Sequence, residues 1–599
     1  MKTSESSSTR VVVAQLYQFG EYVLDPAKRR LQRRDGTMLP LASRIFETLL
    51  FLVEHSGTVL DKERLMAAVW PDSIVEDNNL NQAISTLRRI FGETPGAHRY
   101  IATVPGRGYR FVADVKTSRP LVNTSARIKT IAVLPFKPLV MENRDASLEM
   151  GMADTLITKL SNIREIVVRP LSSVRRYVKI DEEPLLVGRK LGVESILDGS
   201  IQRCNGDIRV TVRLINVANG GALWAGTFDE KFTDIFSVQD AIAERVVAAL
   251  ALRLGSEEKR RLMKRDTENT EAYQLYLKGR YFWWKTAPEE FRKCRDYFHR
   301  AVDADPSYAL GYCGLNSYYG FGSAWGILPP NKGWPRAAKA IEKALELDDS
   351  LAEAHIDLGA YKMVFHRDWA GAEGEVTRGI ELNPTFEEAH YLYSFFLVAM
   401  GRFDEALAEA RRALQLDPLS VRIHQHLGTT FYYARNYDEA ISQYEQTLEL
   451  DPDNSSVHEA LGDAFERKEL RQEAIGEWQK AMTLRADEEL ATVLGSTYAK
   501  GGLAAAMRAV AQRKLERLNK RREIGNYVPA IDYVRAYVRL GDKKQAFQAL
   551  SAACEERNVF ALLLKRDPFY DSLRQDARFP AILNRNGLQK FDTLPSRTD

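Results

Sequence analysis

Short apolar runs and stretches of helical periodicity alternate over the first hundred residues. Turn signals at Asp25-Pro26 and Asp35-Gly36 separate four predicted extended segments: 17–19, 22–24, 30–32 and 38–41. A first helix is predicted after the N-cap residue Ser43, and a second between Asp61 and Pro71. The order of these elements predicts strands followed by helices.

A third helix is predicted from Asp77 to about Phe91, with Gly92 just past its end. Its apolar positions recur at i, i+4, i+7 and i+11 and predict one buried face: Leu80, Ile84, Leu87 and Phe91. The opposite face is polar and carries Asn78, Asn81, Gln82, Ser85, Arg88 and Arg89. A hairpin is predicted next, from 99–104 and 109–112, with Gly106 and Gly108 at its tip.

Those two glycines do not indicate a phosphate-binding loop. No Gly-Lys-Ser/Thr sequence follows them, and no helix is predicted to start there. We therefore interpret them as the tip of the hairpin. Residues 1–16 form a polar tail that we expect to be disordered, and the polar segment 116–127 is interpreted as a linker.

Residues 128–254 have the pattern of an α/β domain with a mixed sheet. Buried strands are predicted at 131–134 and 166–168, and an amphipathic helix lies between them near 152–160. A short helix at 185–191 precedes alternating strands at 195–202, 208–217 and 222–228, and a helix over 242–254 closes the domain.

The rest of the chain is helical and repetitive. Prolines recur every 34 residues at Pro384, Pro418 and Pro452, and so do alanines at Ala406, Ala440 and Ala474. This period predicts an all-α solenoid of stacked helix pairs over 270–500, because one pair is too small to bury its own apolar face. Residues 501–590 predict a further helical, repeat-like region. The segment 321–335, rich in glycine, proline and tryptophan, is interpreted as an insertion.

Composition and charge narrow the classes of function. The 599 residues are 45% hydrophobic and 28% charged with a net charge of +3, which excludes a mostly disordered chain and DNA binding through overall charge alone. The charge is local: between Thr86 and Arg110 there are five arginines and one acid, a net of +4, whereas 17–115 has 13 basic and 12 acidic residues. The four cysteines are widely spaced, no apolar run is long enough to cross a membrane, and a cytoplasmic location is expected.

The first region resembles the OmpR/PhoB-type winged-helix DNA-binding domain over 17–115. The resemblance is carried by Val69-Trp70-Pro71, by 75–81, by Ile84-Ser85-Thr86-Leu87-Arg88 and by 104–111. It implies that the third helix enters the major groove of DNA and that the hairpin is the wing. Since only 16 residues precede this domain, control by phosphorylation of a receiver domain is not expected, and the arrangement looks like one-component CadC-like regulators without their transmembrane helix.

Two further resemblances complete the domain assignment. The middle region is similar to a TolB-like domain, through 131–136, Leu197-Asp198-Gly199-Ser200 and Leu223-Trp224-Ala225. The repeats resemble tetratricopeptide repeats, most clearly over 353–486. Neither resemblance implies a cofactor.

The polar face of the third helix supplies the candidate site. Asparagine and glutamine pair with adenine, and arginine pairs with guanine, so base reading is assigned to Asn78, Asn81, Gln82, Ser85 and Arg88. Contacts to the DNA backbone are assigned to Trp70, Arg89, Arg107, Tyr109 and Arg110. The competing interpretation is a solvated helix face, which the wing and the family resemblance disfavour.

Other candidate chemistry is weaker. His355, His390, His424 and His458 occupy equivalent repeat positions, but stacked helices lie about 10 Å apart, so these histidines cannot share one metal ion and are interpreted as packing residues. The aromatic runs 281–284 and 318–321, with Trp325 and Trp334, either form repeat core or line a peptide groove. No nucleophile elbow, zinc-protease or phosphate-loop sequence occurs, so neither an enzyme nor a bound metal or cofactor is expected.

The sequence therefore predicts a bacterial transcription regulator whose winged helix binds double-stranded DNA. The middle domain and the repeats are expected to receive a signal or a partner, either RNA polymerase or another protein held in the tetratricopeptide groove. A homodimer on paired half-sites is expected. Two alternatives stay open: a scaffold whose winged helix binds protein, and a sensor with enzymatic activity in 128–253.

Overall fold

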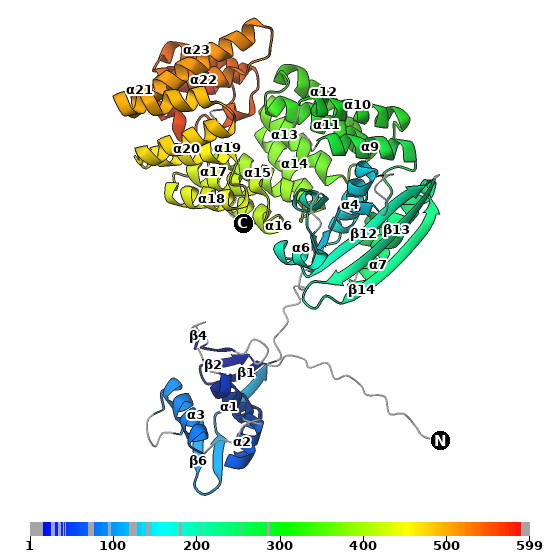
Figure 1. Cartoon of the computed structure of the whole chain (residues 1–599), viewed down its shortest axis with the longest axis vertical. Coiled ribbons are helices and arrows are strands. Elements are labelled where there is room, and N and C mark those ends of the chain that lie inside the picture. The colour runs from blue at the N-terminus through cyan, green and yellow to red at the C-terminus, as the bar shows by residue number, and fades with distance from the viewer. Residues whose placement is uncertain are drawn as a thin grey trace. The chain divides into compact units, whose positions relative to one another are not determined.

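The structure is a computed structural model of the whole chain. It describes residues 16–25, 30–33, 38–39, 41, 43–69, 77–93, 98–118, 129–138, 144–178, 182–204, 206–252, 254–283 and 288–588. The chain divides into two compact units, Met1–Arg127 and Ile128–Asp599 (Figure 1).

The first unit has the strand and helix order of a winged helix. A five-stranded sheet has the order β4-β3-β2-β1-β8, and a three-stranded sheet has the order β5-β7-β6. The strands are β1 Leu16–Phe19, β2 Tyr22–Asp25, β3 Arg30–Arg33, β4 Met38–Leu39, β5 Val59–Leu60, β6 Ile101–Val104, β7 Gly108–Phe111 and β8 Val115–Ser118. The helices are α1 Ser43–Glu54, α2 Lys62–Val69 and α3 Asp77–Ile90.

The apolar stripes of the helices form the core of this unit. The four predicted core residues of the third helix are all less than 5% exposed, which confirms the predicted face: Leu80, Ile84, Leu87 and Phe91. Asp61 caps α2 as predicted, since its Oδ1 accepts a hydrogen bond from the Arg64 backbone N–H at 2.7 Å.

The end of this unit differs from the sequence prediction. The predicted linker began at residue 116, but Val115–Ser118 forms β8, which pairs antiparallel with β1 from Leu16↔Ser118 to Phe19↔Val115. The pairing joins segments a hundred residues apart, and a local hydrophobic pattern carries no signal for it.

The middle domain combines a mixed sheet with helices, as predicted, and the helices cover one face of the sheet. The sheet order is β11-β9-β12-β13-β14, with β10 also paired to β12. Strand β9 is parallel to β11 and β12, and β12, β13 and β14 are antiparallel. Alternate residues of β13 are buried and exposed, so the other face of the sheet is open.

The elements of the middle domain have the following bounds. The strands are β9 Lys129–Val133, β10 Lys137–Pro138, β11 Ile166–Val168, β12 Ser195–Cys204, β13 Asp207–Asn216 and β14 Ala222–Lys231. The helices are α4 Ala146–Ser161, α5 Leu171–Val174, η2 Arg175–Val178, α6 Pro184–Lys190, η3 Phe232–Asp234, α7 Ile235–Ala249 and α8 Ser256–Leu262.

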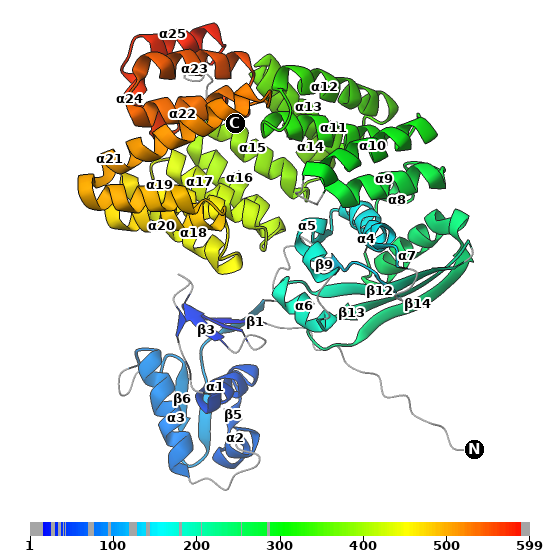
Figure 2. The ribbon, with the colours of Figure 1, turned by 45° about the horizontal axis from the view of Figure 1, so that its top comes forward.

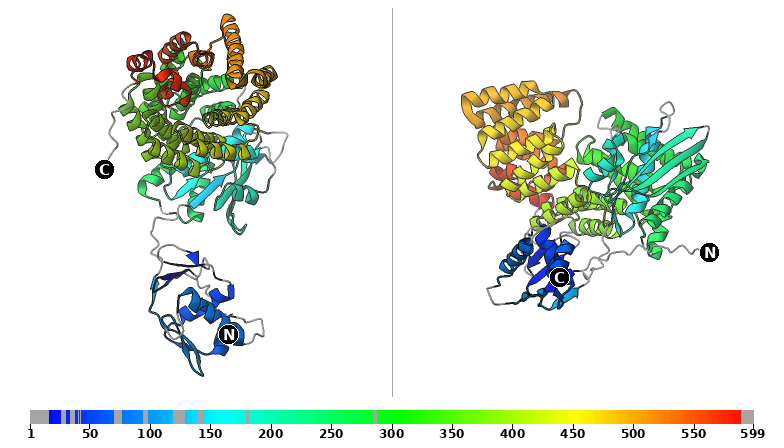
Figure 3. Two further views of the ribbon diagram at one scale, coloured as in Figure 1. Left: turned by 90° about the vertical axis from the view of Figure 1, so that its left-hand side faces the viewer. Right: turned by 60° about the horizontal axis from the view of Figure 1, so that its bottom comes forward.

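The repeat region consists of antiparallel helix pairs (Figures 2 and 3). The first helices of the pairs are α9 Thr270–Trp283, α11 Ala309–Ala324, α13 Ala352–Tyr361, α15 Glu387–Met400, α17 Val421–Tyr433 and α19 Ser455–Arg467. The second helices are α10 Pro288–Ala304, α12 Pro330–Leu347, α14 Trp369–Leu382, α16 Phe403–Leu416, α18 Tyr437–Leu450 and α20 Arg471–Leu484; a single π-helical turn, η4 Lys362–His366, continues α13. The predicted solenoid is confirmed: the three periodic alanines are fully buried, and each periodic proline lies between two pairs.

The residues of the predicted insertion at 321–335 form helix ends and a short link rather than a separate loop. The starts of α11 and α13 are 43 residues apart, against 34 for α15 and α17, so this pair does carry extra residues. Helix α11 continues to Ala324, α12 starts at Pro330, and five residues link them. Gly333 is needed because a Cβ there would lie 1.9 Å from Ser323 Oγ. The glycine and proline content therefore reflects two closely packed helices with a proline at the start of the second, which is a position that proline tolerates.

The remaining helices follow α20 and complete the second unit. They are α21 Glu488–Glu523, α22 Ala530–Leu540, α23 Lys543–Glu555, η5 Val559–Leu563, η6 Pro568–Tyr570, α24 Asp571–Arg574 and α25 Arg578–Arg585. Helix α21 is interrupted at Gly502, where φ is +71°, close to the predicted boundary at 500. Helices α22 and α23 form another repeat-like pair, with Gly541 ending one helix and Asp542 capping the next.

Candidate nucleic-acid interface

The exposed side of α3 is polar along its whole described length. Asn81, Gln82, Ser85 and Arg89 are exposed on the side opposite the core residues. Asn78 lies in α3, but its side chain is outside what the structure describes, and Trp70 lies outside the described residues. Amide, hydroxyl and guanidinium groups thus gather on one helix face, which is the chemistry that reads base edges and phosphates.

Tyr109 connects the hairpin to this face. Its ring belongs to the core and is 7% exposed, and its hydroxyl donates a hydrogen bond to Asn81 Oδ1 at 2.7 Å. The bond uses one acceptor site of the Asn81 amide oxygen and leaves its NH₂ group available as a donor. The hydroxyl of Tyr109, which the sequence assigned to the DNA backbone, thus contacts Asn81 within the domain, and the assigned contact with DNA stays a prediction.

Arg88 also points toward the hairpin. Its Nη2 donates to the Ile101 carbonyl at 3.0 Å and to Thr103 Oγ1 at 2.7 Å. Both acceptors are on β6, so this guanidinium fixes the hairpin against the end of α3. The sequence assigned Arg88 to base reading because its position fits the polar face, and only the three-dimensional packing reveals this second set of partners.

Glu93 strengthens the same junction and was not predicted. Its Oε1 accepts hydrogen bonds from the backbone N–H groups of Tyr100 and, at 3.3 Å, Ile101, and its Oε2 lies 3.7 Å from Arg88 Nε. In the sequence it stood out only as the single acid among five arginines. A single acid among arginines, placed directly after the third helix, is the feature of the sequence that could have indicated a structural role for Glu93.

The hairpin presents basic side chains at its tip. Arg107 and Arg110 are exposed. Gly106 adopts φ of +72° in the turn, and a Cβ on Gly108 would lie 2.0 Å from the Leu60 carbonyl oxygen. These two glycines allow the tight turn and the close approach of β5 to β7, in agreement with the predicted hairpin tip.

The repeated histidines are structural. In three repeats Nδ1 contacts a glutamate of the partner helix, at 2.7 Å for His355–Glu375, 2.6 Å for His390–Glu409 and 2.5 Å for His458–Glu477; His424 contacts Gln443 at 2.8 Å. In all four, Nε2 contacts a carbonyl of the preceding turn. Each ring therefore ties together the two helices and the turn of its own repeat, as the packing interpretation predicted.

Within the described ranges no helix combines the length and apolarity needed to cross a bilayer. In the same ranges, histidine, cysteine, aspartate and glutamate side chains form no group of three or more suited to a metal ion.

Models of known families match all three regions. Residues 36–111 match the model described as transcriptional regulatory protein, C terminal. Residues 126–245 match the second domain of HilA/YgeH-like transcriptional regulators. Residues 387–430 and 426–489 match tetratricopeptide repeat models. The TolB-like resemblance of the middle region remains a prediction.

Three relatives illustrate the range of similar proteins. A protein named putative adenylate cyclase 3, from Rhizobium meliloti, is 29% identical over 232 residues, covering 38% of this chain and 39% of its own length. The transcriptional regulator HilA of Salmonella typhimurium is 23% identical over 393 residues, covering 62% and 67%. The transcriptional activator CadC of Escherichia coli is 37% identical over 97 residues, covering 16% and 19%.

The chain thus combines a winged-helix domain of the transcriptional-regulator type, a HilA/YgeH-type second domain and tetratricopeptide repeats. Its relatives include HilA and CadC, and the matched part spans well under half of the first and third relatives.

Proposed function

We propose that this protein is a sequence-specific DNA-binding transcription regulator. The observation that carries the proposal is the exposed amide, hydroxyl and guanidinium face of α3 beside a basic, glycine-tipped hairpin. A helix of this kind fits the major groove, and the hairpin arginines lie where a phosphate backbone would pass. Asn78, Asn81, Gln82 and Ser85 would read bases, while Arg89, Arg107 and Arg110 would hold phosphates.

The test is selection of DNA sites from fragmented genomic DNA with the purified full chain, followed by mobility-shift titration on the recovered site. A regulator binds that site more tightly than random duplex, by about 10³-fold or more. Absence of any salt-dependent affinity for duplex DNA would instead favour the scaffold interpretation.

Gln82→Ala and Ser85→Ala should each weaken binding to the selected site by about 1–3 kcal/mol, because one base-edge contact is lost. Binding to random duplex should change little, so the ratio of the two affinities is the quantity to measure. Thr58→Ala removes an exposed hydroxyl from the same domain away from α3 and serves as the control. Equal weakening on both kinds of DNA would contradict base reading by these side chains.

Arg107→Ala should weaken binding to every duplex to a similar extent and lower the slope of log affinity against log salt concentration by about one. The reason is that a phosphate contact releases counterions without reading sequence. Arg189→Ala, which removes the same charge from the exposed surface of the middle domain, is the control. If the salt dependence of binding is unchanged in Arg107→Ala, Arg107 does not contact a DNA phosphate.

In this proposal the middle domain and the repeats are the input modules, with RNA polymerase or another protein as the partner of the repeats. Binding as a homodimer to half-sites about one helical turn apart belongs to the same proposal. Its action on chromosomal DNA would place the protein in the cytoplasm. Gel filtration of the DNA complex and the spacing of the selected half-sites test the dimer.

A further inference from the structure

A cavity of about 50 Å³ lies where the middle domain meets the first repeats. Helices α4 and α7 form one side, α9 and the segment 264–267 another, and Glu353 of α13 lies at the end toward the later repeats. Since a water molecule needs about 10–15 Å³ by this measure, the space holds the end of a side chain rather than a large ligand.

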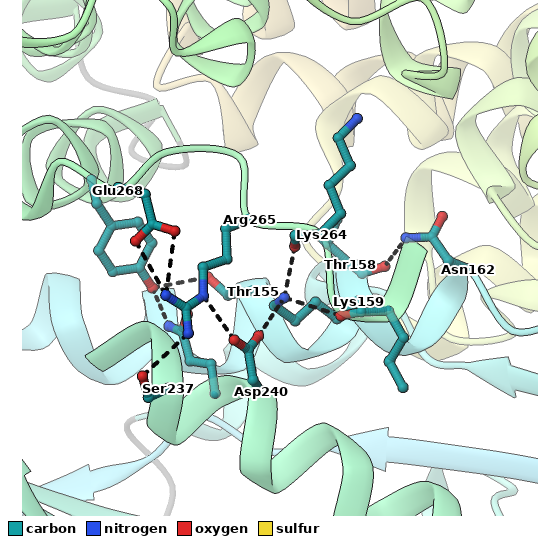
Figure 4. Close-up of polar contacts among 12 residues, drawn as sticks. Thr155, Thr158, Lys159, Asn162, Ser237, Asp240, Lys264, Arg265 and Glu268 are labelled. Atoms are coloured by element: carbon teal, nitrogen blue, oxygen red, sulfur yellow. Dashed lines mark hydrogen bonds and ion pairs between the residues drawn. The ribbon is translucent and has the colours of Figure 1, made fainter. Parts of the chain in front are cut away.

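Basic side chains that line the cavity are already paired, and Figure 4 shows the contacts of Lys159 and Arg265 with Asp240. Lys159 Nζ donates to Asp240 Oδ1 at 2.9 Å, and Arg265 Nε donates to Asp240 Oδ2 at 2.8 Å. Arg280 of α9 reaches Asp154 of α4 at 3.1 Å. These cations already have carboxylate partners, so an anionic ligand would have to displace an acid from them.

The cavity also contains polar groups that lack partners. Among the described residues, neither Asp266 nor Glu353 makes a hydrogen bond or an ion pair, although Lys264 and Lys159 act electrostatically on Asp266 and Arg280 acts on Glu353. Burial raises the pKa of both carboxyl groups. Gln239 is fully buried, its Nε2 donates to Tyr273 Oη at 2.6 Å, and its Oε1 accepts no hydrogen bond. Two carboxylates and the unpaired Gln239 acceptor together favour a ligand that donates hydrogen bonds and carries positive charge.

The acidic character continues onto the next repeats. Asp357 lies one turn after Glu353 on α13, and Glu387 lies 34 residues after Glu353 on α15. Burial and neighbouring carboxylates raise the pKa of Asp357 and of Glu387 to about 8. Buried Asn316 of α11 bonds to Asp357 through its side chain, and its own Oδ1 has no hydrogen-bond partner. We call Asp266, Glu353, Asp357 and Glu387 the acidic strip.

A later repeat shows what can pair with acids of this kind. Glu459 belongs to α19, the first helix of the pair three repeats after that of α13. There, Arg535 and Arg539 of α22 reach Asp463 at 3.4 Å and Glu466 at 2.8 Å, and nearby Lys514, Arg535 and Arg485 lower the pKa of Glu459 to about 2. Arginines of α22 thus cover the acids of α19, whereas no helix among the described residues pairs arginines with the acidic strip in this way; its neighbouring cations include Lys264, Arg280 and Arg422.

We propose that the acidic strip binds a lysine- or arginine-bearing helical segment of a partner protein, with one basic side chain entering the cavity beside Asp266 and Glu353. The proposal rests on the proposed role of the repeats as a partner-binding module and adds the charge class of the partner. The segment would resemble α22, whose arginines four residues apart meet acids of α19. Charge complementarity then selects the partner.

The test is fluorescence anisotropy of the full chain with a labelled 16-residue alanine-based helical peptide that carries arginine at every fourth position. The arginine peptide should bind, and its twin with glutamate at those positions should not. Glu353→Gln/Asp357→Asn/Glu387→Gln should weaken binding by about tenfold or more, because the acids contributing the attraction are neutralised. Glu387→Gln alone should weaken it by about threefold.

The control variant Glu439→Gln/Glu445→Gln/Glu449→Gln removes the same charge from exposed positions of α18 and should bind like the wild type. Equal weakening in both triple variants, equal binding of the two peptides, or binding of spermidine without binding of the arginine peptide would overturn the proposal. DNA affinity, measured on the same variants, should stay at the wild-type level, so a failure of the DNA-binding proposal is seen separately.

Binding should also release protons. Asp357 faces Glu353 on its own helix, Asn316 on α11 and Glu388 on α15; Glu387 faces Glu388, Asp417 and Arg422. With pKa values near 8 both acids are largely protonated at pH 7, and a bound cation favours their ionised forms. Affinity for the arginine peptide should therefore rise from pH 7 to pH 9 in the wild type and stay flat in the acidic-strip variant; a flat wild-type profile contradicts the assignment.

Discussion

Lys159→Ala should lower the free energy of unfolding of the unit 128–599 by about 3–5 kcal/mol, which is the usual cost of removing one partner from a buried ion pair. The Lys159 side chain is 10% exposed and that of Asp240 is 8% exposed. The same Nζ donates to the carbonyl oxygens of Leu262 and Lys264, at 3.1 and 2.9 Å. The alanine variant leaves three buried acceptors short of a donor and opens a void.

Removing Lys159 should weaken the contact between two parts of the unit as well as the stability around its own side chain. Residues 262–264 form the connection from α8 to the first repeat helix, and Lys159 belongs to α4 of the middle domain. The ammonium group therefore joins the connection to the domain that precedes it. We expect the middle domain and the repeats of the variant to unfold in separate transitions.

Urea unfolding followed by circular dichroism, together with protease sensitivity of the segment 254–269, measures both effects. Lys190→Ala is the matched control, since Lys190 pairs with Glu182 at 2.8 Å but its side chain is 47% exposed. An exposed pair of this kind contributes about 0–1 kcal/mol. If the two variants unfold at the same urea concentration, the buried pair is not what joins the domains.

The sequence predicted features that depend on local periodicity. The stripe Leu80, Ile84, Leu87 requires only a helix and a core, and the 34-residue spacing of Pro384, Pro418 and Pro452 requires only stacked pairs. In both cases the pattern in one segment determines which side is buried. The winged-helix fold, the repeats and the exposed face of α3 were therefore accessible without coordinates.

Features that depend on distant partners were not accessible. Asp417 and Asp451 stand in the same Leu-Asp-Pro sequence, yet Asp417 accepts hydrogen bonds from Ser172, at 2.6 Å, and Ser173 of the middle domain, while Asp451 contacts Asn454 in its own turn. Nothing in the repeated sequence separates these two roles. The docking of the middle domain on the repeats is thus a property of the folded chain.

The same reason explains why the sequence did not reveal the contacts that the candidate site residues make within the domain. Position and residue type placed Arg88 and Tyr109 among the DNA contacts, and both do lie beside the polar face. Their hydrogen bonds to β6 and to Asn81 come from the folding of the hairpin back onto α3. The pattern of polar residues on α3 identifies where an interface lies. The packing of the hairpin against α3 determines which of these side chains also make hydrogen bonds within the domain.

Arg88→Ala should weaken binding to the selected site and to random duplex by a similar factor, about 10- to 100-fold. Hydrogen bonds to charged groups contribute about 1.5–3 kcal/mol, and loss of the bonds to Ile101 and Thr103 frees the hairpin from α3. The melting temperature of the winged-helix unit should fall as well, since the side chain of Arg88 is only 27% exposed. Thermal unfolding and mobility shifts on both DNAs measure these effects.

Arg89→Ala is the control, because Arg89 is the neighbouring arginine on the exposed side of α3 and its removal should lower affinity without lowering the melting temperature. A different result for Arg88→Ala would be equally informative: an unchanged melting temperature together with loss of the preference for one base at a single position of the DNA site. That result would mean the guanidinium leaves β6 on binding and pairs with guanine, as its position in the sequence first indicated. The two outcomes differ in stability and in specificity, so one pair of measurements separates a residue that orients the hairpin from one that reads DNA.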